Sequence, residues 1–363
     1  MPGVAPAAGG GGGAQASGPV SGTLPPSIGG AARPIPPTTV PDSVVEAWRR
    51  EVGPSVPGPI AVGDSVVLVG TGNGRVLALS TATGERFWRR KFTGSATSGV
   101  VRRGNELFIA SDHRLGRLYR LRLVDGEREW ESEVGGAPFP PLPLGDRLYA
   151  ATRGGDVVAL DARTGAERWR RSLDAPIGAA PVAHGAALLV PAADTLLWLD
   201  LETGERVAQL PMGAHASADP VVSADRLHLP LESGEVVAVD LRTRKPAWRT
   251  GLGEVAHARP VAGGDGALYV LTRAAEVWRV RPEDGAAERV ASFDASARAS
   301  LAWAGDRLLV GLLDGVLVAV TAEGERVWSR HLGEPIVSPA VAWAGAVYVP
   351  LLGGTIVKLE AAP

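Results

Sequence analysis

Eight times along this chain, at intervals of 38 to 42 residues, one position recurs that in six cases holds Trp. Its occupants, in order, are Trp48, Trp88, Trp130, Trp169, Ala208, Trp248, Val290 and Trp328. Self-similarity at a period near 40 residues is typical of β-propeller blades, each of which buries its faces only when its neighbours stack against it. The spacing therefore predicts a propeller with eight blades.

The sequence inside each repeat predicts four short strands. Small residues follow the recurring position and lead into a first strand, and an apolar second strand begins seven or eight residues later. These second strands are expected at 66–69, 107–110, 148–151, 188–191, 227–230, 268–271, 308–311 and 347–350. A third strand then reaches a tight turn such as Thr164-Gly165, where Gly supplies the positive φ that a hairpin needs. No stretch has sustained helical periodicity, so the fold class is all-β.

The last repeat lacks its fourth strand, because the chain ends soon after the third strand at 356–360. Residues 44–52, around Trp48, have the pattern of that missing strand. We therefore expect an eight-bladed β-propeller of four-stranded antiparallel blades over 44–363, closed by pairing of the N- and C-terminal strands. Residues 1–43 are rich in Gly, Pro and Ala and are expected to form a disordered tail.

Composition excludes several classes of function. The chain has no Cys, which rules out thiol catalysis and disulfides. A net charge of −2 without basic runs gives no sign of nucleic-acid binding. No apolar stretch is long enough for a transmembrane helix, and neither a signal peptide nor a lipidation Cys is visible.

Residues 159–169, ALDARTGAERW, closely resemble the repeat of propellers of the pyrroloquinoline-quinone (PQQ) type. Parts of the same phrase recur at 78–84, 199–204, 238–243 and 324–328, so that the resemblance covers about residues 44–360. Two groups of proteins carry this repeat. One comprises the PQQ-dependent alcohol and sugar dehydrogenases. The other is the BamB family of outer-membrane assembly lipoproteins, in which a tether carries a single propeller, and the plan of this chain is similar to it.

The resemblance to the BamB family implies a non-enzymatic, protein-binding scaffold of the bacterial cell envelope or periplasm, without a cofactor and monomeric. Its partner would be the outer-membrane barrel assembly machine. Two alternatives stay open: a quinoprotein dehydrogenase that binds PQQ with Ca²⁺, and a propeller that senses a small ligand. The dehydrogenases typically use an Asn ligand for Ca²⁺ and a disulfide beside PQQ, whereas the two Asn residues here, Asn73 and Asn105, lie in expected turns.

Polar residues at equivalent places of two neighbouring repeats give the candidate site. Asp219 and Arg259 each precede the Pro-Val step of a first strand, and His215 and His257 lie in the same two loops. We expect these four residues at one mouth of the axial channel, with Asp219 and Arg259 forming an ion pair or contributing to a ligand or partner site.

The recurring aromatic and acidic residues are expected to have structural roles. Packing between blades is predicted for the indoles of Trp48, Trp88, Trp130, Trp169, Trp248 and Trp328. The recurring Asp161, Asp200 and Asp240 are expected to stabilise turns rather than to bind metal.

Overall fold

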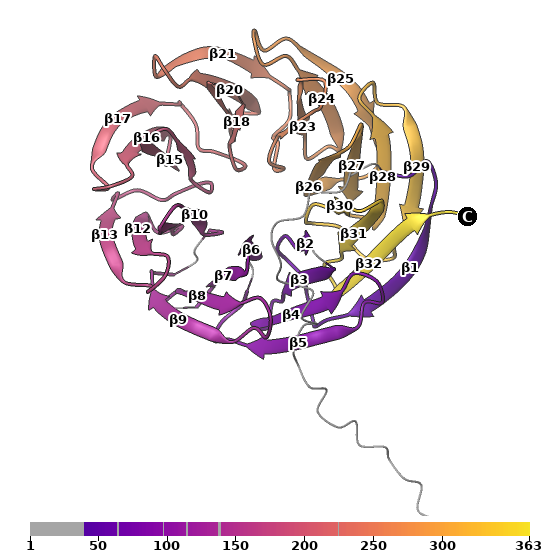
Figure 1. Cartoon of the computed structure of the whole chain (residues 1–363). Helices are drawn as coiled ribbons and strands as arrows, with labels where there is room; N and C mark the ends of the chain where they lie inside the picture. The colour runs from indigo at the N-terminus through magenta and orange to yellow at the C-terminus, as the bar shows by residue number, and fades with distance from the viewer. Residues whose placement is uncertain (1–39, 64, 97, 114, 137–138, 224) are drawn as a thin grey trace, which may run out of the picture.

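The computed structural model describes residues 40–363 except 64, 97, 114, 137–138 and 224, and the side chain of Ala299 is also left out. Residues 1–39, most of the expected disordered tail, therefore lie outside the described residues. The described residues form 32 strands and no helix. These strands make eight antiparallel sheets of four strands each, arranged in a ring, which confirms the eight-bladed propeller (Figure 1).

Blades 1 to 4 follow one another along the chain, and each runs from an inner first strand to a fourth strand on the rim. Their bounds are β2 Ala61–Gly63, β3 Val66–Gly70, β4 Arg75–Ser80 and β5 Arg86–Lys91; β6 Val100–Arg103, β7 Glu106–Ser111, β8 Arg117–Arg122 and β9 Arg128–Glu133; β10 Leu142–Leu144, β11 Arg147–Ala151, β12 Asp156–Asp161 and β13 Glu167–Ser172; β14 Val182–His184, β15 Ala187–Ala192, β16 Thr195–Asp200 and β17 Arg206–Pro211.

Blades 5 to 8 repeat this order, except that the fourth strand of blade 8 comes from the beginning of the propeller. Their bounds are β18 Val221–Ser223, β19 Arg226–Pro230, β20 Glu235–Asp240 and β21 Lys245–Gly251; β22 Val261–Ala262, β23 Leu268–Leu271, β24 Glu276–Val280 and β25 Ala287–Ser292; β26 Ala297–Ala304, β27 Arg307–Leu312, β28 Val316–Thr321 and β29 Arg326–His331; β30 Val341–Trp343, β31 Ala346–Pro350, β32 Thr355–Ala361 and β1 Val44–Glu51.

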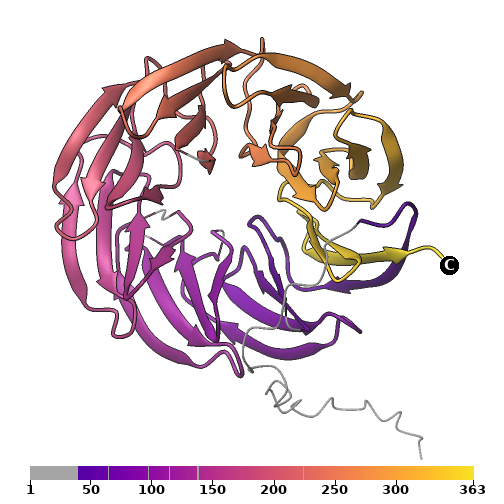
Figure 2. The ribbon, with the colours of Figure 1, turned by 45° about the horizontal axis from the view of Figure 1, so that its top comes forward.

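The ring closes through the two ends of the described chain. Strand β1 pairs antiparallel with β32, from Val44 opposite Ala361 to Glu51 opposite Thr355. Figure 2 shows the indigo strand β1 beside the yellow strand β32. The closure expected from the incomplete last repeat is therefore confirmed.

The packed part of the chain begins by residue 40, before the start at 44 that composition suggested. The Val40 side chain is only 4% exposed and lies in the core between blades 7 and 8. The Pro41 carbonyl accepts a hydrogen bond of 2.8 Å from Trp328 Nε1, and Asp42 forms an ion pair with Arg307.

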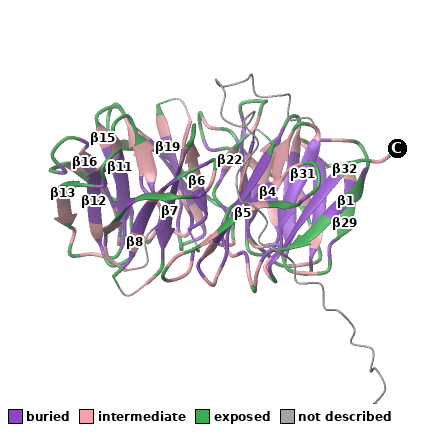
Figure 3. Cartoon of the chain, turned by 60° about the horizontal axis from the view of Figure 1, so that its bottom comes forward, coloured by how far each residue is buried: buried purple, intermediate pink, exposed green. Residues whose placement is uncertain are grey.

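The hydrophobic core is divided into eight clusters, one between each pair of neighbouring blades. The middle strands are buried on both faces, as in β3, because each blade is covered on both sides (Figure 3). The rim strands are mostly exposed or half-buried, and in β5 only Trp88 is buried. This burial explains why the second strands lie where the sequence predicted them, because a strand covered on both faces has to be continuously apolar.

The six recurring indoles lie between blades. They are 2–9% exposed, and each Nε1 donates to a carbonyl in the segment that leads into the fourth strand of the following blade, at 2.8–3.1 Å. In five of the six cases the ring lies against the Gly of the following blade's turn; at Gly204, for example, a Cβ atom would meet Trp169 at 2.6 Å. Gly is thus required at these turns both by its positive φ and by the close approach of the indole.

The junction after Ala208 lacks the indole and also lacks the turn Gly. The corresponding turn residue of blade 5 is Arg244, which adopts a φ of 57° despite having a side chain. A left-handed backbone costs a non-Gly residue about 1 kcal/mol, so this position tolerates Arg only because no indole competes for the space of its Cβ. At the junction after Val290, the backbone carbonyl of Val290 lies close to Gly324 of the next blade, where other junctions have an indole.

Candidate binding sites

The loops before β18 and β22 carry the four residues expected at the channel mouth. The two loops are adjacent: the Ser217 hydroxyl of the first loop donates a hydrogen bond of 2.6 Å to the Ala256 carbonyl of the second. Both β18 and β22 are the first strands of their blades, and Figure 1 shows β18 on the inner side of the ring. His215 and Arg259 are exposed, and Asp219 and His257 are half-buried.

The prediction of an ion pair between Asp219 and Arg259 was wrong. Asp219 Oδ1 instead accepts a hydrogen bond of 2.7 Å from the backbone N–H of Ala180, in the preceding blade. In the part of the chain that the structure describes, Arg259 has neither an ion pair nor a side-chain hydrogen bond with another residue. Equivalent positions on neighbouring blades thus do not bring the two charges together, because Asp219 turns toward the blade before its own.

Other polar side chains at the same positions also join neighbouring blades. The Ser300 hydroxyl donates to the Ser338 carbonyl at 3.0 Å, and the Ser338 hydroxyl donates to the Pro57 carbonyl at 3.1 Å. Both bonds run from one blade to the next, and the second crosses the ring closure. Most of this polarity therefore joins neighbouring blades, whereas the guanidinium of Arg259 and the imidazole of His215 are exposed.

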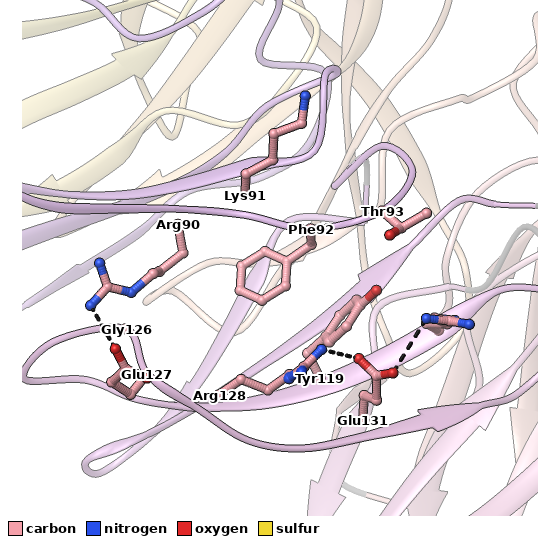
Figure 4. Close-up of a pocket in the computed structure, with 10 residues that line it drawn as sticks. Arg90, Lys91, Phe92, Thr93, Tyr119, Gly126, Glu127, Arg128 and Glu131 are labelled. Atoms are coloured by element: carbon pink, nitrogen blue, oxygen red, sulfur yellow. Dashed lines mark hydrogen bonds and ion pairs between the residues drawn. The ribbon is translucent and has the colours of Figure 1, made fainter.

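A groove of about 390 Å³ lies on the rim between blades 1 and 2 (Figure 4). The rings of Phe92 and Tyr119 form its apolar wall, with centroids 4.7 Å apart. Four cationic and two acidic side chains line it, namely Arg90, Lys91, Arg117, Arg128, Glu127 and Glu131. This excess of positive charge beside an apolar wall suits an acidic segment of a partner protein.

The cations of this groove are partly neutralised. Arg90 pairs with Glu127 at 3.1 Å, Arg117 pairs with Glu131 at 3.3 Å, and Arg128 also pairs with Glu131. The side chains of these pairs are partly exposed, so each pair contributes little to stability and can exchange partners with an arriving carboxylate. Sequence reasoning missed the groove, because its residues come from β5, β8 and β9 and share no local motif.

The recurring Asp residues act in turns. Asp161 Oδ1 accepts hydrogen bonds from the backbone N–H and the hydroxyl of Thr164, at 2.8 and 2.9 Å, and Asp200 and Asp240 have the same contacts with Thr203 and Thr243. These bonds hold the pKa of Asp161 well below its usual range. Among the described residues, no three His, Cys, Asp or Glu side chains are grouped so that they could hold a metal ion, and no helix could cross a membrane.

His228 on β19 is a buried polar residue that sequence reasoning did not single out. Its side chain is fully buried, and neither ring nitrogen has a hydrogen-bond partner among the described residues. It occupies the place that Tyr149 and Tyr348 occupy in blades 3 and 8, where the phenol reaches a turn carbonyl of the next blade. Burial, with the nearby charge of Arg226 as a smaller cause, lowers the pKa of His228 to about 4.

We expect His228 to make the protein sensitive to mild acid. The unfolded chain takes up a proton at this residue near pH 6.5, whereas the folded chain does so only near pH 4. The stabilising difference is thus complete above pH 6.5 and is lost as pH falls toward 4, by about 3 kcal/mol. Denaturant unfolding at pH 7.5 and 4.5 should show a smaller loss in His228→Phe, a residue with a precedent at Phe108 in blade 2. An equal loss of unfolding free energy in both proteins would contradict the assignment of the acid sensitivity to His228.

Comparison with known proteins identifies the family. An eight-bladed ring of PQQ-type repeats defines the class of PQQ-like propeller proteins. The sequence profile described as outer membrane protein assembly factor BamB matches residues 42–144, 131–254 and 232–362. These matches extend over nearly the whole propeller, and the chain belongs to the BamB family.

Individual relatives are more distant. The outer membrane protein assembly factor BamB of Burkholderia pseudomallei is 31% identical over 180 residues, which are 47% of this chain and 46% of that protein. The protein of the same name from Yersinia pestis is 24% identical over 257 residues, 61% of this chain and 65% of that one. The aligned region thus spans about half to two thirds of these two relatives.

Solved structures show the same fold. BamB from Moraxella catarrhalis superposes with a TM-score of 0.74 at 19% identity, covering 88% of this chain and 100% of that one. A quinohemoprotein alcohol dehydrogenase from Pseudomonas putida HK5 gives a TM-score of 0.71 at 13% identity, covering 90% of this chain and 79% of that one. At these identities the superpositions describe the propeller and carry no information on activity.

Proposed function

We propose that this chain is a non-enzymatic, protein-binding scaffold of the cell envelope that assists the assembly of outer-membrane proteins. The observation that carries the proposal is the family match from residue 42 to residue 362. Two surfaces suit a protein partner: the rim groove between blades 1 and 2, and the loops of blades 5 and 6 that carry His215, His257 and Arg259. The partner is the barrel assembly machine.

Binding to the barrel-bearing subunit of that machine tests the proposal directly. Calorimetric titration of the purified chain with the soluble part of that subunit should give a dissociation constant in the micromolar range or tighter. Arg259→Ala should weaken binding about tenfold if the channel mouth is the contact, as expected for an interfacial Arg. Arg206→Ala, an exposed Arg on the rim strand of blade 4, is the matched control and should bind as the unchanged chain does. Absence of binding by the unchanged chain would overturn the proposal.

A quinoprotein dehydrogenase is the second candidate, because the dehydrogenases share the PQQ-type repeat with this chain. The donors of this chain fit it poorly. Asn73 accepts a hydrogen bond of 2.8 Å from the Thr71 hydroxyl in the β3–β4 turn, and Asp219 is engaged by the Ala180 N–H. The chain also contains no Cys for the disulfide that typically lies beside PQQ in those enzymes.

We expect PQQ with Ca²⁺ to leave the melting temperature unchanged and to support no dye-linked alcohol oxidation. A ligand present at one hundred times its dissociation constant would raise the free energy of unfolding by about 2.7 kcal/mol, which a melting curve detects. Micromolar binding of PQQ that disappears in Arg259→Ala would establish the dehydrogenase alternative instead.

A further inference from the structure

At three junctions of the ring an arginine at the start of the second strand bridges neighbouring blades, and between blades 2 and 3 Arg120 of the third strand reaches the same place. In these three cases it is the first residue of the second strand, and its guanidinium reaches the segment that leads into the fourth strand of the next blade. Arg147 donates to the carbonyls of Leu201 and Glu202 at 2.8 and 3.1 Å. Arg226 contacts the corresponding carbonyls of blade 6, and Arg307 that of Pro41, at 3.2 Å.

Blade 8 has Ala346 at this position, as blades 4 and 6 have Ala187 and Ala267. The register makes the equivalence explicit, because Ala346 pairs with the last residue of its first strand, as Arg147, Arg226 and Arg307 do. The turn of blade 1 that would receive the arginine contains Thr81 and Ala82. At the junction between blades 8 and 1 the bridging guanidinium is therefore replaced by a methyl group.

A pocket of about 530 Å³ occupies this place. Ala346, Thr81 and Ala82 line it together with the indole of Trp343 and the carboxylate of Glu360. Thr81 presents its carbonyl oxygen at this junction, since that oxygen accepts from Trp48 Nε1 at 3.1 Å and from the Tyr348 hydroxyl at 3.4 Å.

Lys358 is the one cation that lines this pocket, within the described residues. Its side chain is only 8% exposed, and its ammonium pairs with Glu360 and lies 5.8 Å from the centre of the Tyr348 ring. Glu360 is 49% exposed and retains acceptor capacity, because a carboxylate can accept several hydrogen bonds. The charges of Lys358 and Glu360 cancel, so the turn carbonyls and the aromatic wall determine what the pocket takes.

We propose that this pocket, the arginine socket, binds the side chain of an arginine presented by a partner protein. A guanidinium placed as in Arg147 would donate to the carbonyls of Thr81 and Ala82 and to Glu360. A planar guanidinium also stacks favourably on an indole such as Trp343. The same chain therefore shows three times, in its own junctions, which group fits this turn. The inference concerns a binding site on the isolated chain and does not depend on the proposed function.

The test titrates N-acetyl-arginine amide into the full chain and follows the Trp343 indole N–H resonance, assigned with Trp343→Phe. We expect a saturable shift in the millimolar range, and none with the neutral isostere N-acetyl-citrulline amide. Ala346→Arg, which fills the arginine socket from within the chain, should abolish the shift and raise the melting temperature. A probe response that persists in Ala346→Arg would overturn the proposal.

Two charge variants separate a cation site from an anion site. Glu360→Gln should weaken binding of the arginine probe, and Lys358→Met should strengthen it, each by about fivefold, as expected for one half-exposed charge contact. The opposite signs would mean that the pocket takes an anion and would refute the proposal. If Lys358→Met fails to fold, because Lys358 lies opposite Trp48 in the sheet, the sign measured in Glu360→Gln decides alone.

Discussion

A chain that begins at residue 52 should melt at least about 10 °C below a chain that begins at residue 40, or fail to fold. The shorter chain lacks β1, which supplies the fourth strand of blade 8 by pairing with β32. It also loses Trp48, which closes the core cluster between blades 8 and 1. Deleting a buried Trp alone typically costs 3–5 kcal/mol, and the exposed edge of β32 adds to this loss.

The chain that begins at residue 40 is the matched control. It keeps Val40, the Pro41 carbonyl and Asp42, which contact blades 7 and 8, and should melt with the full chain. Trp48→Ala in the full chain should lie between the two truncations, since it removes the indole but keeps the strand. Melting by circular dichroism, with chromatography to detect association through the open edge, makes the comparison. Equal midpoints for the two truncated chains would refute closure by β1 as a source of stability.

The fold was predictable because most repeats follow the same local pattern. A buried middle strand must be apolar throughout, and a tight turn against an indole must be Gly, so Leu148–Ala151 and Gly165 could be assigned from sequence. Eight repetitions remove the ambiguity that a single strand pattern leaves. The boundary at Val40 was missed because Val40 and Pro41 resemble the residues before them, and only the contact with blade 7 distinguishes them.

The candidate sites were less predictable, because they depend on the direction of single side chains. The repeat placed Asp219 and Arg259 on neighbouring blades, but it could not show that Asp219 turns back to Ala180. Ala346 carries a weaker signal, since alignment of the repeats sets it beside Arg147 but sets Ala187 and Ala267 there as well. That signal becomes interpretable only when the structure shows what the arginine contacts. The short side chain of Ala346 is informative only because the contacts of Arg147, Arg226 and Arg307 at the same position are known.

Trp169→Ala should lower the free energy of unfolding by about 3–5 kcal/mol, the usual cost of emptying an indole site in a core. The ring is 7% exposed, lies 6.0 Å from the Tyr149 ring and covers Gly204 of the next blade. Removing it opens a cavity between blades 3 and 4. Because the turn of blade 4 is held by many other contacts, the cavity cannot collapse fully, and most of the cost is expected to persist.

Packing rather than hydrogen bonding should account for this loss. The Leu201 carbonyl, which accepts from Trp169 Nε1 at 3.1 Å, also accepts from the Tyr149 hydroxyl at 3.1 Å and from Arg147 at 2.8 Å, so it remains satisfied without the indole. Trp169→Phe should therefore recover about half of the free energy lost in Trp169→Ala, since it restores much of the buried ring area. Urea unfolding of the three proteins at pH 7.5 measures both differences. If Trp169→Phe were as unstable as Trp169→Ala, the Nε1 hydrogen bond, and not the ring, would be what holds blades 3 and 4 together.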